Sequence, residues 1–203
     1  MKKILVTFHY YELNRHYKEN LMFFLLYAWR PELDFLVLIS GDCSVPLIKK
    51  SNIEYAHVPN MNHDFGAYSY AVQNQIKPFH SYDRLIFINS LVRGPFHSGN
   101  HSILWYERLL SLIDDEHPLV GSTINILSKE HEFSIAFRSL FPKYNMPYTH
   151  VQTTTAYTMT KEAFEILVEE GFYELDYKLE KYEVILHYEL LLSQIFIFMD
   201  SSH

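Results

Sequence analysis

A short apolar run near the middle of the chain, Leu85-Ile-Phe-Ile88, is the feature that most constrains how this sequence can fold. Four residues are too few for a helix, and a run without a polar member is typical of a strand buried on both faces. Asn89 and Ser90 follow the run directly, and Gly94-Pro95 turns the chain soon afterwards. Open α/β sheets bind their ligands at the carboxyl ends of such strands. We therefore predict a central strand here, with a ligand site at its end.

The rest of the chain alternates short apolar runs with patterns of helical spacing, which favours right-handed βαβ units and a mostly parallel sheet. We expect one α/β domain over residues 1–203, either a whole protein or the N-terminal part of a longer one, with a late Thr-rich strand running antiparallel. Asn14 or Asn20 is expected to cap the first helix. Strands are expected at 4–8, 35–40, 53–58, 85–88, 119–126 and 151–159, and helices at 21–28, 67–76, 102–113, 161–170 and 182–199. Residues 46–50 fit a short helix or a turn, and residues 129–144 fit no single element.

Composition disfavours several classes of protein. The formal net charge of −7 argues against a nucleic-acid partner, because duplex-binding proteins gather Lys and Arg. The single Cys43 rules out an internal disulfide and a multi-cysteine zinc site, and it fits a reducing compartment, so we expect a cytoplasmic protein. The most apolar stretch, 185–199, is interrupted by His187, Glu189 and Gln194, so we expect no membrane span.

Several well-known catalytic motifs are missing. The sequence has no GxxxxGK[ST] phosphate loop, no GxGxxG fingerprint, no HExxH zinc pair and no GxSxG elbow. Kinase, dehydrogenase, zinc-protease and α/β-hydrolase functions are therefore disfavoured.

Polar and aromatic residues follow the first strand and precede the helix before the central strand. His9, Tyr10 and Tyr11 leave the first strand, where a ring can stack on a nucleobase and an imidazole can bind a phosphate, although a packed loop explains them equally well. Asp64 stands just before a predicted helix, so it can cap that helix while one oxygen reaches a sugar hydroxyl. Gly66 allows another backbone to approach closely.

The third group of candidates, Asn89, Ser90 and Arg93, follows the central strand. The guanidinium fork of Arg93 matches the oxygens of a diphosphate. The alternative for Arg93 is a surface ion pair with Asp83.

Two later segments carry further candidates. If their segment is extended, His150, Gln152 and Thr154 share one face, which is either a binding surface or the wet face of an edge strand. Glu189 has apolar sequence neighbours, which favours a raised pKa suited to acid–base chemistry. A solvent-facing position on an amphipathic helix is the alternative for Glu189.

Read in order, these segments form a series of motifs. The series comprises Thr-Phe-His-Tyr-Tyr-Glu (7–12), Asn-His-Asp-Phe-Gly-Ala-Tyr (62–68), Tyr-Asp-Arg-Leu-Ile-Phe-Ile-Asn-Ser-Leu-Val-Arg-Gly-Pro-Phe (82–96), Leu-Val-Gly-Ser-Thr-Ile-Asn (119–125) and His-Val-Gln-Thr (150–153). It resembles GT-A-fold nucleotide-sugar glycosyltransferases of the rhamnan-synthesis type, which carry patterns such as N-x-G-x-D-F-G-A-Y. It is also similar to the glycosyltransferase domains of chlorovirus proteins that glycosylate capsid protein.

The resemblance implies a Rossmann-like GT-A fold and a glycosyltransferase activity. The donor would be a UDP-sugar carrying a hexose or a deoxyhexose such as rhamnose. The acceptor would be a glycan or glycoprotein, including a viral capsid glycoprotein made in the host cytoplasm.

The resemblance also implies roles for individual residues. Asp64 and Glu189 would be the catalytic carboxylates, with Asp64 holding the donor sugar and Glu189 near the acceptor. His150 and Gln152 would lie on the acceptor side. The donor and its nucleotide would be bound by Thr7, His9, Tyr10, Ser40, Gly41, Asn89, Ser90 and Arg93.

The position of the metal motif departs from the family. Asn89-Ser90-Leu91 stands where many GT-A enzymes carry Asp-x-Asp, whose carboxylates hold Mn²⁺ or Mg²⁺. Asn and Ser offer only neutral oxygens, so either such an ion is held weakly, with help from Asp64, or Arg93 neutralises the diphosphate. Three rival functions stay open: a non-catalytic sugar- or nucleotide-binding module of the same fold, a nucleotidyltransferase, and a structural interaction protein.

Overall fold

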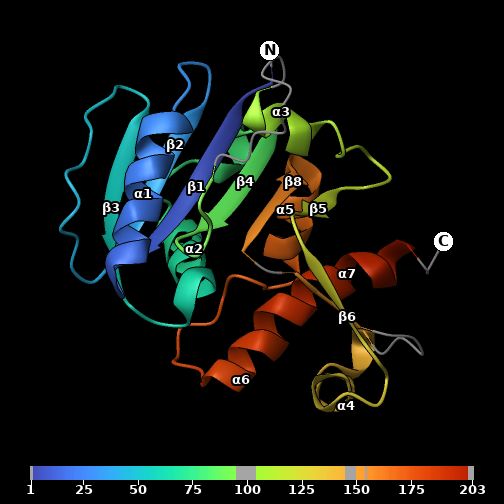
Figure 1. Cartoon of the computed structure of the whole chain (residues 1–203). Helices are drawn as coiled ribbons and strands as arrows, with labels where there is room; N and C mark the ends of the chain where they lie inside the picture. The colour runs from blue at the N-terminus through green and yellow to red at the C-terminus, as the bar shows by residue number, and fades with distance from the viewer. Residues whose placement is uncertain (1, 95–103, 145–149, 154, 201–203) are drawn as a thin grey trace.

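A mixed six-stranded sheet with helices on both faces forms the centre of the computed structural model, which describes residues 2–94, 104–144, 150–153 and 155–200 (Figure 1). The strand order is β3-β2-β1-β4-β8-β5, so β3 and β5 form the two edges. Strands β1 to β4 run parallel, and β8 runs antiparallel to both of its neighbours. The expected α/β class, mostly parallel with one late antiparallel strand, is confirmed. The strands are β1 (Ile4–Tyr11), β2 (Asp34–Ser40), β3 (Ile53–Val58), β4 (Arg84–Asn89), β5 (Leu119–Gly121) and β8 (Ala156–Thr160).

The expected helices form, with shifted ends. They are α1 (Arg15–Tyr27), α2 (His63–Gln73), α3 (Trp105–Leu110), α4 (Glu132–Leu140), α5 (Lys161–Glu169), α6 (Lys181–Val184) and α7 (Leu191–Asp200), with 3₁₀ turns at η1 (Phe79–Ser81) and η2 (Pro142–Tyr144). Residues 46–50 form no helix, and 129–144 contains α4 and η2. Asn14 is the cap of α1, since its side-chain oxygen accepts the His16 N–H at 2.9 Å.

Two of the expected strands are each divided between two sheets. The segment 119–126 begins as β5 and continues as β6 (Ile124–Leu127), while 151–159 begins as β7 (His150–Thr153) and continues as β8. Strands β6 and β7 pair with each other in a separate antiparallel sheet. Thr155, between β7 and β8, has a φ of +57°, which is unfavourable for a β-branched residue and was not predicted. Pro95 and Thr154, which figured in the predicted turn and the predicted polar face, lie outside the described residues.

Alternate residues of β1 point to opposite faces of the sheet, so the molecule has two cores. Val6 and Phe8 pack with α1 and α3 on one face, whereas α2, α5 and the C-terminal helices cover the other (Figure 1). On that second face Phe65 of α2 stacks on Tyr157 of β8, with 6.1 Å between ring centroids, and on Tyr188, with 5.1 Å. One aromatic ring thus joins three elements.

The last described residues form one continuous helical stretch, Lys181–Asp200, in which a π-helical turn, η3 (Ile185–Leu190), links α6 to α7. This 20-residue stretch contains a window with a mean hydropathy of 1.3, which is long and apolar enough to cross a membrane, so the expected absence of a membrane span is not confirmed. Within the most apolar window 44% is buried, and Tyr188, Leu190 and Leu192 are fully buried in the second core. Core packing therefore accounts for much of the apolar character of this helix.

Candidate functional site

The carboxyl ends of β1 and β4 meet the first turn of α2 on one side of the sheet. Parallel pairing sets His9 beside Asn89, and Tyr11 beside Ser40 of β2. A pocket of about 240 Å³ lies here, and we call it the strand-end pocket. It is lined by His9, Tyr11, Tyr17, Asn60, His63, Asp64, Asn89, Ser90 and Leu91. The fold thus brings together residues that the sequence presents in separate segments.

Asp64 and Asn89 form the centre of the pocket. The Asn89 side-chain amide donates to Asp64 Oδ2 at 2.8 Å, and Asn89 Oδ1 accepts the backbone N–H of Leu91 at 3.2 Å. The Tyr68 hydroxyl, also on α2, donates to the carbonyl of Ile88 at 3.0 Å and ties the helix to the end of β4. Asp64 lies within the first turn of α2, which begins at His63, so it is not the helix cap proposed as the alternative. Asn89 holds one carboxylate oxygen, and among the described residues no hydrogen bond engages the other, which can therefore accept one from a ligand.

His9 forms the buried wall of the pocket. Its Nε2 lies 2.9 Å from Ser40 Oγ, and its ring stands edge-on to Tyr68. Burial disfavours the imidazolium and lowers the pKa of His9 to about 4, although the nearby Asp64 carboxylate opposes this shift. His9 is therefore neutral at pH 7 and acts as a hydrogen-bonding group rather than as a charge.

The conformation of the loop before α2 is fixed by backbone and side-chain contacts. Asn62 and His63 both have a φ of +55°, in the left-handed region. The Asn62 side chain donates to the Tyr177 carbonyl and accepts from the Leu179 N–H, each at 2.8 Å. A Cβ at Gly66 would lie 1.8 Å from the Met61 carbonyl oxygen, so only glycine fits there. This loop holds His63 and Asp64 at the pocket.

Ser90 is held by its neighbours. Its Oγ accepts the Tyr11 N–H at 3.3 Å, and its carbonyl accepts from the Asn20 side chain at 2.9 Å. Asn20, proposed as a possible cap of α1, instead ties that helix to the end of β4.

Thr7, Ser40 and Gly41, expected around the nucleoside, lie behind or beside the pocket. Thr7 is fully buried two residues deeper in β1 than His9, and its Oγ1 has no hydrogen-bond partner in the described part of the chain. Ser40 is buried and supports His9. Gly41 follows β2 with a φ of +77° and is exposed. Their nucleotide-binding roles stay predictions.

Tyr10 is placed on the wrong face for the predicted role. It is fully buried in the core beneath α1 and α3, and its hydroxyl donates to Glu12 Oε2 at 2.9 Å. The alternation of a strand sends Tyr10 away from the face that carries His9 and Tyr11. The expectation that Tyr10 lines the nucleoside pocket is therefore corrected.

Arg93 also lies outside the pocket lining. Its side chain is exposed, and its guanidinium packs over the Phe23 ring of α1 at 5.3 Å from the centroid. Asp83, the alternative partner, instead accepts the backbone N–H of Lys3 at 2.6 Å. The Arg93 side chain, which was expected to bind the diphosphate, thus contacts Phe23 instead of the pocket.

The acceptor-side candidates belong to other parts of the fold. Glu189 is half-buried in η3, and it is not among the described residues that line the strand-end pocket. His150 and Gln152 belong to β7, in the two-stranded sheet, opposite Leu127 and Asn125 of β6. Their roles stay predictions.

Three polar lining residues, Asn60, His63 and Tyr17, were missed in the sequence. His63 directly precedes Asp64, so the loop motif itself points to it. Tyr17 lies in the first turn of α1, the helix that follows β1. The rule that strand ends and the following helix starts share one edge of the sheet could have found Tyr17.

The donor set does not match a firmly held divalent ion. In the parts of the chain that are described, no group of three or more His, Cys, Asp and Glu side chains could hold a metal. The pocket offers one carboxylate, Asp64, while Asn89 Oδ1 and Ser90 Oγ already accept backbone N–H groups. Mn²⁺ and Mg²⁺ require several oxygen ligands, and anionic ones are preferred. Asp64 on its own is therefore too small a ligand set to hold such an ion firmly.

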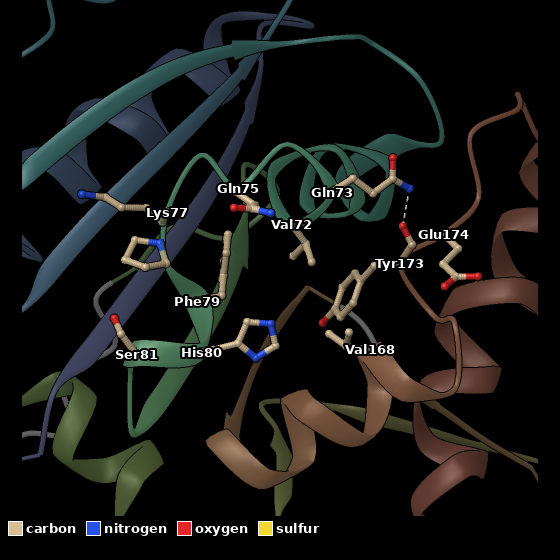
Figure 2. Close-up of a pocket in the computed structure, with 11 residues that line it drawn as sticks. Val72, Gln73, Gln75, Lys77, Phe79, His80, Ser81, Val168, Tyr173 and Glu174 are labelled. Carbon is tan, nitrogen blue, oxygen red and sulfur yellow. Dashed lines mark hydrogen bonds between the residues drawn. The ribbon is translucent and has the colours of Figure 1, made fainter.

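A second and larger cavity, of about 650 Å³, lies at the other end of α2 and near the start of β4 (Figure 2). We call it the helix-end cavity; Val72, Gln73, Phe79, His80 and Tyr173 are among its lining residues. The Gln73 amide donates to the Tyr173 carbonyl across one wall, as the dashed line in Figure 2 shows. None of the candidate site residues lines this cavity. The candidate residues that the fold brings together therefore line the strand-end pocket and not the larger cavity.

Comparison with solved structures finds glycosyltransferases. The chain is similar to glucosyl-3-phosphoglycerate synthase from Mycobacterium tuberculosis in complex with UDP, with 12% identity over 96% of this chain and 80% of that one and a TM-score of 0.48. It is similar to the galactosyltransferase LgtC in complex with donor and acceptor sugar analogs, with 14% identity, coverage of 91% and 70%, and a TM-score of 0.44. It is also similar to a glycosyltransferase involved in the glycosylation of the major capsid of PBCV-1, with 12% identity over 85% of this chain and 66% of that one and a TM-score of 0.36. No family model and no curated protein sequence matches the chain. At these sequence identities and TM-scores, the similarity concerns the fold alone.

Proposed function

We propose that this chain is a GT-A-type glycosyltransferase that moves a sugar from a UDP-sugar donor to a glycan acceptor in the cytoplasm. One observation carries the proposal: Asp64, Asn89 and His9 converge in a single pocket at the carboxyl ends of parallel strands. That edge is where open α/β sheets bind their ligands. Three of the motifs that resemble glycosyltransferases contribute to this pocket.

The sugar and the acceptor are proposed on the resemblance alone. The transferred sugar is a hexose or a deoxyhexose such as rhamnose, and the acceptor is a glycan or glycoprotein, with a viral capsid glycoprotein as one candidate.

The pocket suits substitution at an anomeric carbon. Such a reaction has oxocarbenium character while negative charge develops on the leaving diphosphate. Asn89 holds one oxygen of Asp64, so the other oxygen can accept a hydrogen bond from a donor hydroxyl or the proton of the acceptor. An inverting reaction would need Asp64 as that base, whereas in a retaining reaction the leaving phosphate takes the proton.

A non-catalytic sugar- or nucleotide-binding module is the second candidate. The observation that favours it is that the described lining residues of the pocket include a single carboxylate, with Asn89 and Ser90 at the position of the usual acidic pair. Such a module would bind the donor without cleaving it.

Binding and turnover measured together distinguish the two. UDP, uridine, UDP-glucose, UDP-galactose and UDP-linked rhamnose are titrated with EDTA or with Mn²⁺, and release of UDP from each donor is followed. A transferase releases UDP, and Asp64→Asn should slow that release by about a hundredfold or more. Asp115→Asn, at an exposed carboxylate away from the pocket, is the matched control. Binding without release supports the module, and no binding of any of these ligands overturns both functions.

A further inference from the structure

We infer that His63 binds the leaving diphosphate in the strand-end pocket, the role that the motifs implied for Arg93. This inference rests on the donor-binding function proposed above. It follows from the lack of Lys and Arg in the described pocket lining, from the partners of His9 and Asn89, and from the position of His63 at the start of α2.

Arg93 is engaged elsewhere. Its guanidinium lies over the Phe23 ring, on the side of the sheet covered by α1, and the side chain is exposed to solvent. The lining of the strand-end pocket, as far as the chain is described, contains no Lys or Arg at all. A diphosphate in this pocket therefore needs another donor.

Two other donors in the pocket lining, His9 and Asn89, already have partners. His9 is buried against Ser40, and the amide of Asn89 donates to Asp64. His63 differs from them because it is exposed at the pocket, and its ring has no hydrogen bond or ion pair to any described residue. An imidazole always carries at least one N–H, so the His63 ring can donate to a phosphate oxygen.

The position of His63 on α2 suits an anion. His63 is the first residue of this 11-residue helix, where backbone N–H groups lack partners within the helix and the dipole is positive. The neighbouring loop is fixed by Asn62, whose side chain bonds two backbone groups, and by the close contact at Gly66. The backbone of His63 is thereby fixed next to Asp64, the carboxylate proposed to face the sugar.

The reaction step is then simple. The bond between the anomeric carbon and the diphosphate oxygen breaks, its electron pair goes to that oxygen, and the acceptor oxygen bonds to the carbon as its proton passes to Asp64 in an inverting reaction or to the leaving diphosphate in a retaining one. His63 donates a hydrogen bond to an oxygen of the departing diphosphate and stabilises the charge that develops there.

The test compares the affinities for UDP and for uridine, both with EDTA present, by calorimetric titration. The key variant is His63→Asn, because asparagine tolerates a positive φ and its shorter amide cannot reach as far. We expect His63→Asn to weaken UDP binding by about tenfold or more while uridine binding is unchanged. His63→Gln, which keeps a donor at the end of a longer side chain, should recover part of the loss. The thermal unfolding midpoint of each variant shows whether it is folded.

Two further variants serve as controls. His80→Asn changes an exposed histidine at the helix-end cavity and should alter neither affinity. Arg93→Ala should leave the ratio of the two affinities unchanged. The role of His63 is wrong if His63→Asn leaves the ratio of UDP affinity to uridine affinity unchanged. It is also wrong if Arg93→Ala abolishes the preference for UDP over uridine. In both cases the proposed donor site still stands. If the wild-type chain binds neither ligand, the proposed function itself falls.

Discussion

Asn62 has a backbone conformation that most side chains avoid, with a φ of +55°. In the motif pattern N-x-G-x-D-F-G-A-Y this position belongs to glycine, which adopts positive φ without steric cost. Asparagine is among the few other residues that tolerate it. Here the side chain also bonds Tyr177 and Leu179, so one residue both bends the loop and attaches it to the segment before the C-terminal helix.

Substitutions at Asn62 should separate these two contributions. Asn62→Gly keeps the conformation but loses both hydrogen bonds, so unfolding should become easier by about 1–3 kcal/mol. Asn62→Ala should cost about 1 kcal/mol more, because its Cβ is strained at this φ. Urea denaturation should therefore rank the wild type first, the glycine variant second and the alanine variant last. An alanine variant as stable as the glycine variant would contradict the left-handed assignment.

His9 should make stability depend on pH. Its folded pKa of about 4 lies below the ordinary value of 6.5, so the unfolded state binds more protons between these pH values. The free energy of unfolding therefore rises with pH through this window, by about 3 kcal/mol from this residue, and the contribution is complete above pH 6.5. Denaturation of the wild type and of His9→Gln at pH 4.5, 5.5 and 7 measures it.

The wild type should lose stability more steeply than His9→Gln as the pH falls. Some slope should persist in the variant, because burial also lowers the pKa of His187. Equal slopes in the two proteins would show that His9 is not buried as described.

Part of the strand-end pocket could be predicted from the sequence alone. His9, Asp64, Asn89 and Ser90 were found because strand ends and helix starts can be recognised from apolar runs and turns. Tyr10 was misplaced although period-two alternation excludes it from the face of His9. Arg93 could not be placed, because it lies beyond the strand where no periodicity sets its direction.

At the scale of elements, two predicted strands are each shared between two sheets. Local propensity cannot show this, because the Thr-rich residues of β7 and β8 suit either sheet equally. The division depends on the backbone of Thr155 and on the insertion of β8 between β4 and β5, which is a long-range pairing. The four-residue core of the central strand, by contrast, was predictable because no polar residue interrupts the apolar run from Leu85 to Ile88.

Phe65 is the contact between elements whose loss should matter most for the second core. Its ring is stacked between β8 and η3, so Phe65→Ala should reduce the free energy of unfolding by about 3–5 kcal/mol. Tyr70→Ala, at a partly exposed position on the same helix, is the matched control and should change it by about 0.5 kcal/mol or less. Chemical denaturation measures both, and similar losses would mean that α2 does not pack through Phe65.

At the scale of the whole molecule, the C-terminal helix is held by the second core. Tyr188, Leu190, Leu192 and Ile195 are buried there, although the stretch is apolar enough to pass for a membrane span. We expect the amides of residues 186–195 to be among the most protected from hydrogen exchange in aqueous buffer without lipid. Rapid exchange of these amides, slowed only by added vesicles, would instead assign the helix to a membrane.

Both borders of the main sheet are poor templates for another chain. At one border β3 carries Glu54 and the exposed His57, and Lys77 pairs with Glu54 at 2.7 Å. At the other border β5 is only three residues long. Charged or very short edge strands resist pairing with a neighbouring molecule, so neither edge of the sheet favours the addition of a strand from another chain. A concentrated solution of this protein should therefore be slow to form fibrils.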